Sequence, residues 1–204
     1  ATWAEMLNRG YKAIQTDRPS ELAGYLAAYN RDRSAQSVIE AEHFHGFNYG
    51  TQGFSVPAAA DSRLNKKVEK LTAGDYLEYR RIVFDGTETL LNLTMQGLSG
   101  GTLGVYLDGL AEENRIAQLT LASSEDYRTV TATLDKTPET GTHTVYLRFT
   151  GAPKQALASL DSFRFVSAAG FTDAQLEELQ ITTTAGTAPV LPGSVQVTAN
   201  GETY

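Results

Sequence analysis

The chain has 204 residues, with 17 Lys and Arg against 24 Asp and Glu, so its formal net charge is −7. Cysteine is absent, which excludes disulfides, thiolate–zinc sites and a cysteine nucleophile, and three histidines give little support to a Ser-His-Asp enzyme. The acidic balance argues against nucleic acid as a main partner, because phosphate binding needs a basic patch. No apolar run reaches the roughly 20 residues that span a bilayer. No signal peptide opens the chain, so we expect a cytoplasmic protein or an internal piece of a longer one.

Residues 1–37 have the pattern of short helices. Apolar side chains within Leu22–Tyr29 repeat at the spacing of one helix face, and Pro19 suits a first helical turn, whose amide groups are unpaired in any case. A second short helix is predicted over Trp3–Leu7, and a strand over Tyr11–Thr16. Because a lone strand needs a sheet to join, we expect this region to belong to a larger unit.

Residues 38–167 change character and contain short β-rich runs separated by Gly, Asp, Ser and Asn. The predicted strands are Val38–Glu42, Asp75–Phe84, Thr89–Met95, Thr102–Leu107, Arg115–Leu121, Arg128–Leu134, His143–Phe149 and Leu160–Val166. Short strands at regular intervals are typical of an antiparallel sandwich or barrel. Apolar and polar residues alternate in Val145–Phe149, which indicates a strand with one buried face. We therefore expect an all-β fold.

The last region, residues 168–204, has one helix signal and an extended tail. Thr172–Gln175 fits a capping box and predicts a short helix that ends at Leu179. A tail rich in Thr, Gly and Pro follows, in which Val195–Thr198 is the one clear strand. We expect a linker helix and the beginning of a further domain.

Four segments occur in a fixed order along the middle region. They are Val38–Glu42, Gly74–Tyr79, Gly141–Leu147 and Leu160–Phe165. In order and spacing they resemble a family 6 carbohydrate-binding module. The resemblance implies a β-sandwich of the jelly-roll type that binds glycans without cutting them, so no catalytic residues are expected in this chain.

The flanking segments resemble other families. Gly10–Pro19 is similar to the last strand and turn of a glycerophosphodiester phosphodiesterase barrel, and Gly186–Pro192 is similar to the opening of a bacterial immunoglobulin-like domain. These resemblances imply a helical remnant of a preceding domain over 1–37, the module over 38–167, and a linker helix with a truncated immunoglobulin-like segment over 168–204. They also imply a large secreted or cell-surface bacterial protein with a separate catalytic domain.

Two carboxylates near the start of the module are candidate metal ligands. Glu40 and Glu42 are two residues apart, so on a strand they project from the same face, where they repel each other unless a cation lies between them. Oxygen ligands suit Ca²⁺. In the resembled family such a pair joins an aspartate of the closing strand to hold a structural calcium, and Asp161 stands at that position. The resemblance thus implies Glu40, Glu42 and Asp161 as ligands, with backbone carbonyls near Arg63–Asn65; a solvated strand face is the alternative.

The expected sugar site departs from the pattern of the resembled family. There, two aromatic side chains enclose a sugar, whose apolar C–H face suits a flat ring, and an asparagine binds a hydroxyl. In this chain Tyr127 stands where a tryptophan is usual, Lys70 takes the second aromatic position, and Ser159 takes that of the asparagine.

These departures leave three alternatives open. Lys70 can pair with the carboxylate of an acidic sugar such as a uronic acid. Binding can instead involve the first loop, where Phe44, Phe47 and Tyr49 cluster, unless these rings pack against the core. Losing an aromatic face and an amide can also abolish weak binding altogether.

Taken together, the residues and the resemblance predict a non-catalytic carbohydrate-binding module with a structural calcium, which holds an attached enzyme near a polysaccharide. The alternatives are a glycan-silent structural spacer and a fragment of a glycerophosphodiester phosphodiesterase. A zinc site at His43 and His45 lacks a third ligand at a usual spacing. The expected partners are a polysaccharide or oligosaccharide and neighbouring domains of the parent chain, with no nucleic acid and no membrane span.

Overall fold

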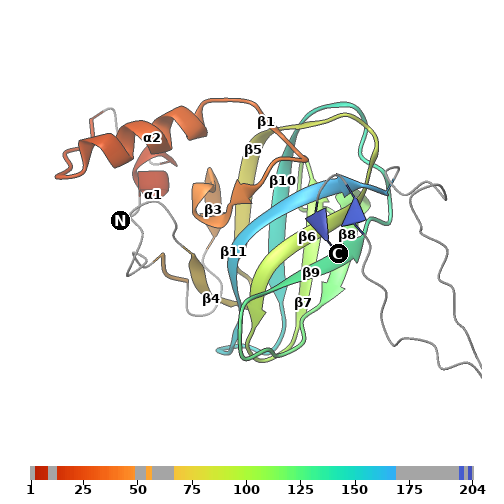
Figure 1. Cartoon of the computed structure of the whole chain (residues 1–204). Helices are drawn as coiled ribbons and strands as arrows, with labels where there is room; N and C mark the ends of the chain where they lie inside the picture. Colours follow the sequence, from red (N-terminus) through yellow and green to blue (C-terminus); the bar gives the residue numbers. More distant parts are fainter. Residues whose placement is uncertain are drawn as a thin grey trace, which may run out of the picture.

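Two β-sheets pack face to face in the computed structural model, and two helices lie at one end of them (Figure 1). The structure describes residues 3–8, 13–48, 54–56, 67–168, 198–199 and 202–203. The helices are α1 (Trp3–Asn8) and α2 (Pro19–Tyr29). The antiparallel sandwich predicted from the sequence is confirmed.

The first sheet has the strand order β1-β5-β10-β7-β8, and β3 pairs with β5 off this path. Its strands are β1 (Arg33–Ser34), β3 (Gly46–Asn48), β5 (Tyr76–Phe84), β7 (Thr102–Leu107), β8 (Arg115–Thr120) and β10 (Gly141–Thr150). The pairing of β1 with β5 is parallel, whereas the others are antiparallel.

The second sheet has the order β2-β11-β6-β9, and β4 pairs with β11 off this path. Its strands are β2 (Ile39–Glu40), β4 (Val68–Thr72), β6 (Glu88–Gly97), β9 (Arg128–Thr133) and β11 (Ala156–Ser167). Two 3₁₀ turns, η1 (Ala41–His43) and η2 (Glu112–Asn114), and a small hairpin of β12 (Thr198–Ala199) and β13 (Glu202–Thr203) complete the elements. Every pair of strands in the second sheet is antiparallel.

The core lies between the two sheets and is rich in aromatic side chains. Tyr79 of β5 meets Phe163 of β11 with ring centroids 4.8 Å apart, and Phe84 meets Phe165 at 4.8 Å. All four side chains are at most 1% exposed. Burial of each contributes on the order of 2 kcal/mol, so these cross-sheet contacts hold the two layers together.

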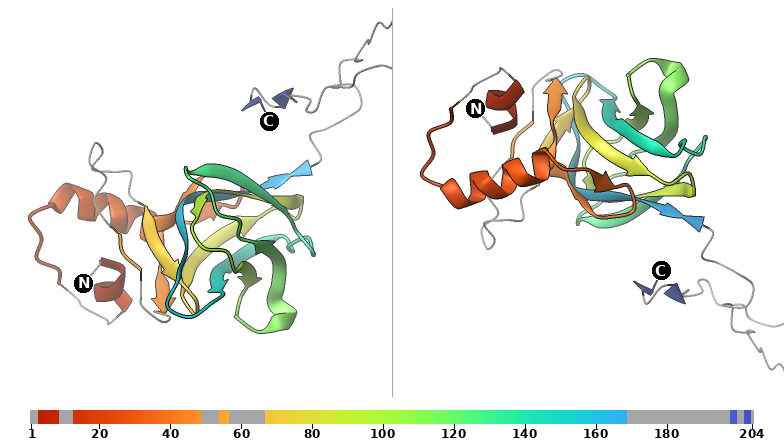
Figure 2. Two further views of the ribbon diagram at one scale, coloured as in Figure 1. Left: turned by 90° about the horizontal axis from the view of Figure 1, so that it is seen from below. Right: turned by 90° about the horizontal axis from the view of Figure 1, so that it is seen from above.

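Helix α2 packs directly against the sandwich (Figure 2). The Tyr25 hydroxyl donates a hydrogen bond to the Phe44 carbonyl at 3.1 Å, and the Trp3 ring of α1 lies 5.6 Å from the Tyr25 ring. The following strand β1 then joins the first sheet by pairing with β5. The N-terminal region, which the sequence suggests as a remnant of another domain, therefore contributes contacts to this one.

Several local expectations differ from the structure. Residues 13–16 of the predicted strand Tyr11–Thr16 form no strand. The predicted strand Val38–Glu42 ends at Glu40, because the chain turns into η1. The short strands β1, β3 and β4 are missing from the sequence-based prediction. The predicted helix up to Leu179 and most of the predicted strand Val195–Thr198 lie outside the described residues.

Within the described part of the chain, neither helix has the length and apolar character that a membrane crossing requires.

Candidate functional site

The loop that precedes β9 is held against the end of β6. The Gln96 side chain donates to the Glu125 carbonyl at 2.6 Å, and the amide of Gly97 donates to the Ser124 hydroxyl at 3.1 Å. A Cβ atom on Gly97 would lie 1.9 Å from the carbonyl oxygen of Ala122, so only glycine permits this approach. These contacts fix the loop immediately before Tyr127.

Three residues that the sequence assigns to a sugar site lie together. Ser159 of β11 is 4% exposed, and its hydroxyl accepts a hydrogen bond from the backbone amide of Lys70 in β4 at 3.2 Å. A side-chain hydrogen bond also joins Ser159 to Tyr127. Burial raises the pKa of the Tyr127 phenol, against the lowering effect of the bond with Ser159; the charges of Glu69 and Asp161 add to the rise. We call Tyr127, Ser159 and Lys70, together with Lys67, whose ammonium group lies over the Tyr127 ring, the Tyr127 cluster.

One lysine side chain covers the Tyr127 ring, and a second lysine lies nearby on β4. The ammonium nitrogen of Lys67 lies 3.9 Å from the ring centroid, which is a cation–π contact. Lys70 has a φ of +60° and stands at a register shift between β4 and β11. Such a bulge redirects a side chain, and Lys70 is exposed whereas Leu71 and Thr72 after it are both buried.

The candidate calcium ligands Glu40 and Asp161 lie close enough to interact. Glu40 of β2 stands opposite Ser162 of β11, next to Asp161. Burial raises the pKa of the Glu40 carboxyl, and the negative charge of Asp161 raises it further. The Oδ1 atom of Asp161 is buried and accepts no hydrogen bond from the described residues. A cation here would relieve both the repulsion and the unsatisfied oxygen.

Glu42 lies on η1 and does not share a strand face with Glu40, because β2 has already ended. Its side chain is 8% exposed, and its charge helps to raise the pKa of the buried Tyr79 phenol, after the larger effect of burial. Among the described residues, no three His, Asp or Glu side chains form a group that could hold a metal ion. The geometric argument from strand alternation is therefore wrong, although all three carboxylates lie near the junction of β2, η1 and β11.

The aromatic residues of the first loop pack against one another. Phe44 is 1% exposed, and its ring lies 5.4 Å from that of Phe47 and 5.6 Å from that of Phe54. Phe47 and Phe54 are also in edge contact at 5.6 Å. These rings extend the core, with Phe47 and Phe54 partly buried against it, while Tyr49 lies outside the described residues.

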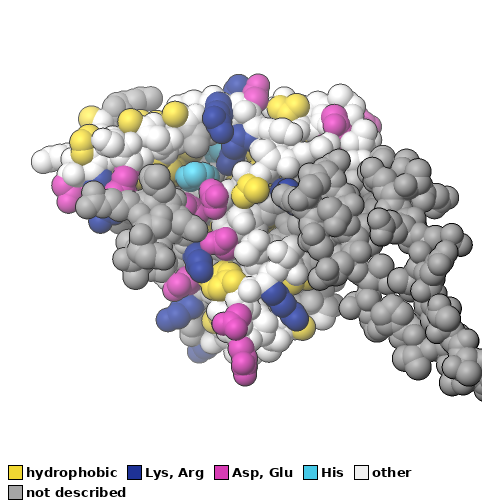
Figure 3. Space-filling view, in the orientation of Figure 1, with side chains coloured by type: hydrophobic (Ala, Val, Ile, Leu, Met, Phe, Trp, Pro, Cys, Tyr) yellow, Lys and Arg dark blue, Asp and Glu magenta, His cyan; other side chains and the backbone are white. Residues whose placement is uncertain are grey.

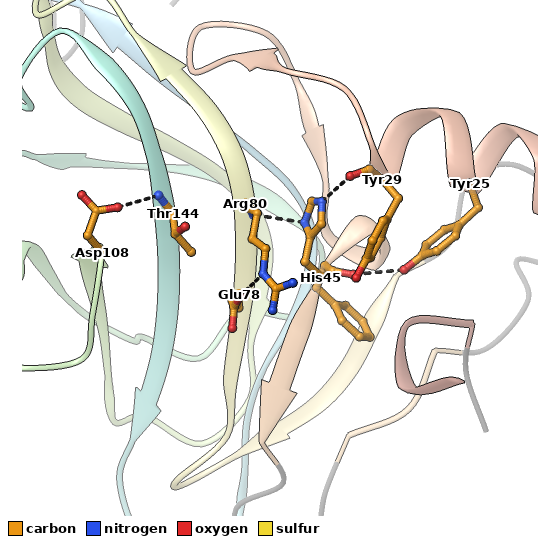
Figure 4. A network of polar contacts seen from close by, with 8 residues as sticks. Tyr25, Tyr29, His45, Glu78, Arg80, Asp108 and Thr144 are labelled. Carbon is orange, nitrogen blue, oxygen red and sulfur yellow. Dashed lines mark hydrogen bonds and ion pairs between the residues drawn. The ribbon is translucent and has the colours of Figure 1, made fainter. Parts of the chain in front are cut away.

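His45 joins α2 to the first sheet (Figure 4). The backbone amide of Arg80 donates to His45 Nδ1 at 3.0 Å, so the proton is on Nε2, which donates to the Tyr29 carbonyl at 2.7 Å. Burial lowers the pKa of His45 to about 4, despite the opposing effect of the bond to Tyr29; the positive charges of Arg33 and Arg80 lower it further. Since both ring nitrogens are engaged, His45 is a structural residue and not a zinc ligand.

A row of tyrosines lies on the outer face of the first sheet, and none of them is among the candidate site residues predicted from the sequence. Tyr146 of β10 stands opposite Tyr106 of β7, and its ring lies 6.0 Å from that of Tyr76 on β5. The ring of Tyr106 lies over Gly104, where a Cβ atom would be 2.7 Å from it. Because successive side chains of a strand point to opposite faces, the apolar residues Leu77 and Leu147, which are buried, could have indicated that the neighbouring tyrosines lie on the outer face. Strand pairing, which brings them together, cannot be read from one sequence.

Residues 40–167 match the family model described as carbohydrate binding module (family 6). The chain belongs to this family. Family 6 modules are non-catalytic binding modules, so the membership agrees with the sandwich and with the expectation of a sugar-binding role. No curated protein matches the chain.

Two solved family 6 modules have the same fold. The module from Clostridium stercorarium, in complex with cellobiose, is 21% identical and has a TM-score of 0.57 over 68% of this chain and 99% of its own. The module from Clostridium cellulolyticum, in complex with xylose, is 26% identical and has a TM-score of 0.56 over 66% of this chain and 100% of its own.

A larger enzyme also contains this fold. The glycoside hydrolase family 43 arabinoxylan arabinofuranohydrolase from Bacillus subtilis, in complex with cellotetraose, is 20% identical, with a TM-score of 0.57 over 67% of this chain. This chain spans only 28% of the length of that enzyme. The likeness concerns the fold alone.

Proposed function

We propose that this chain binds a glycan through the Tyr127 cluster and thereby keeps an attached enzyme close to its polysaccharide. The observation that carries the proposal is the meeting of Tyr127, Ser159 and Lys70, which come from separate parts of the chain and are joined by hydrogen bonds. An aromatic ring next to hydrogen-bonding groups is the combination that sugar recognition requires. The complexes of related modules with cellobiose and with xylose support a short saccharide as ligand.

The test is a glycan array with the full chain in calcium-containing buffer. Tyr127→Ala should abolish binding to the glycans that the wild type retains, because the only aromatic ring of the cluster is removed. Tyr146→Ala is the matched control, since it removes a tyrosine from the outer face of the first sheet. Loss of binding with Tyr146→Ala and retention with Tyr127→Ala would move the site to that face and overturn the assignment.

A structural calcium belongs to the same proposal. Glu40 and Asp161 would hold it, with Glu42 nearby on η1; the buried Oδ1 of Asp161, which has no hydrogen-bond partner among the described residues, supports this assignment. Calcium would neutralise the carboxylates and tie β2 and η1 to β11. Binding at a hundredfold excess over Kd stabilises a fold by about 2.7 kcal/mol, so chelation should lower Tm by roughly 5–10 °C.

Asp161→Asn is the variant that tests the metal, and Asp135→Asn is its control. Asp135 is an exposed carboxylate beyond the opposite end of β9. The control should show the wild-type fall in Tm on addition of chelator, whereas Asp161→Asn should show little. An unchanged wild-type Tm in chelator would contradict the calcium assignment.

A structural spacer is the second candidate function, and the position of Lys67 favours it. Its ammonium group covers a face of the Tyr127 ring on which a sugar could stack. An array without any bound glycan, together with a normal calcium response, would support the spacer. In either case we place the parent protein outside the cell or at its surface, with a separate catalytic domain; the similarity of Gly10–Pro19 to a phosphodiesterase barrel supports this arrangement.

A further inference from the structure

The Tyr127 cluster has an unusual charge for a sugar site, because one lysine ammonium covers its one aromatic ring and a second lysine is anchored by its backbone on Ser159. Lys67 has its ammonium nitrogen 3.9 Å from the ring centroid. Lys70 is turned outward by the bulge in β4 while its own amide is anchored on Ser159. Neither lysine forms an ion pair with a carboxylate of the described residues.

This arrangement disfavours a neutral sugar on the covered face of Tyr127. Stacking there requires that the sugar displace the Lys67 ammonium, which loses its cation–π contact and gains no counter-charge in return. A sugar that carries a carboxylate can instead pair with the ammonium groups while its ring contacts the tyrosine. Charge-assisted hydrogen bonds are stronger than neutral ones, so the same two lysines that hinder a neutral glycan help an acidic one.

The backbone at Lys70 supports a functional role for its side chain. A φ of +60° is costly for any residue other than glycine, and such strain persists mainly where the surroundings enforce it. Here the hydrogen bond to Ser159 and the shift of register with β11 maintain it. The result is an exposed lysine whose backbone is tied to Ser159, the residue that also contacts Tyr127, on a protein whose net charge is −7.

We infer that the Tyr127 cluster selects an acidic saccharide, such as one that contains a uronic acid, with Lys67 and Lys70 as the groups that bind the carboxylate. This inference rests on the proposed glycan-binding function. Glu69 acts on the Tyr127 hydroxyl, and its negative charge would repel an anion placed there. The carboxylate therefore belongs on the lysine side of the ring and the uncharged part of the sugar on the hydroxyl side. Figure 3 shows that basic and acidic side chains share this face of the molecule near β4 and β9.

The experiment compares trigalacturonic acid with its methyl ester, which has the same rings without the charge. Titration calorimetry on the full chain at low salt should show the acid bound about three- to tenfold more tightly, as expected for one or two partly exposed ion pairs. The preference should shrink in 0.5 M salt, where such pairs are screened. Lys67→Met should remove most of it and Lys67→Arg should restore it.

Lys136→Met is the matched control, because Lys136 is exposed and its ammonium donates to the Glu113 carbonyl, away from the cluster. Equal losses in Lys67→Met and Lys136→Met would assign the preference to overall charge and overturn the inference. Equal or tighter binding of the methyl ester by the wild type would overturn it too, while glycan binding itself stands. If neither trisaccharide nor any array glycan binds, both the inference and the proposed function fail.

Discussion

Acidification should destabilise the chain through one residue, His45. The ring is 1% exposed and its pKa is lowered to about 4, against about 6.5 in an unfolded chain. Between these two values the unfolded state binds more protons, so stability falls as the pH drops from about 6.5 towards 4. Integrating the difference from pH 7 to pH 5 gives a loss of about 2 kcal/mol, a large part of the stability of a small domain.

The physical cause is the geometry at the end of α2. Protonation of Nδ1 would replace an acceptor by a donor opposite the Arg80 amide, and it would place a third positive charge near Arg33 and Arg80. The charge of His43, on η1, adds to this unfavourable field. Release of His45 would also remove the hydrogen bond that holds the Tyr29 carbonyl.

The assay is urea unfolding of the wild type and His45→Gln at pH 7, 6 and 5. Glutamine can still donate to the Tyr29 carbonyl but does not titrate, so the variant should be less stable at pH 7 and should lose about 2 kcal/mol less on acidification. His143→Gln is the control, because it removes a histidine paired with Asp108 at the surface and leaves His45 in place. Parallel pH profiles for the wild type and His45→Gln would refute the reasoning.

Three further substitutions test the local packing. Gly97→Ala should cost about 3 kcal/mol and disturb the Tyr127 loop, because its Cβ would overlap the Ala122 carbonyl; a normal urea midpoint would contradict this. Tyr79→Phe removes a buried hydroxyl that donates to a backbone carbonyl at 2.8 Å, so calorimetry should show a loss of about 1–2 kcal/mol. Asp75→Ala removes the carboxylate that accepts hydrogen bonds from the buried amide and hydroxyl of Thr72, at 2.6 and 3.1 Å. Urea unfolding should show a loss of about 2–3 kcal/mol, and a smaller loss for Asp75→Asn.

The long strands could be predicted from the sequence, whereas the short ones could not. The predicted strands from Asp75–Phe84 to Leu160–Val166 overlap β5 to β11, because alternation and turn residues are local signals. The strands β1, β3 and β4 have two to five residues and exist through their pairing partners. Local propensity cannot indicate a partner that lies far along the chain.

For the candidate site, the sequence with its family resemblance named residues that the structure brings together. Tyr127, Lys70 and Ser159 meet because β4 and the loop before β9 both lie beside β11. The sequence could not show that Lys67 covers the Tyr127 ring, since a cation–π contact depends on side-chain direction. It also misjudged Glu42, because alternation holds only while the strand continues, and β2 ends after two residues.

The central position of β11 has a consequence for folding during synthesis. β11 is the last strand of the sandwich in chain order, and it is the partner of β2, β4 and β6. While the ribosome is still adding residues before 156, those three strands expose edges that can pair with other nascent chains. In the first sheet, the pairing of β7 with β8 joins strands that follow each other along the chain and needs no distant segment. Closure of the second sheet must therefore follow synthesis of nearly the whole module, which makes slow, late folding the expected course.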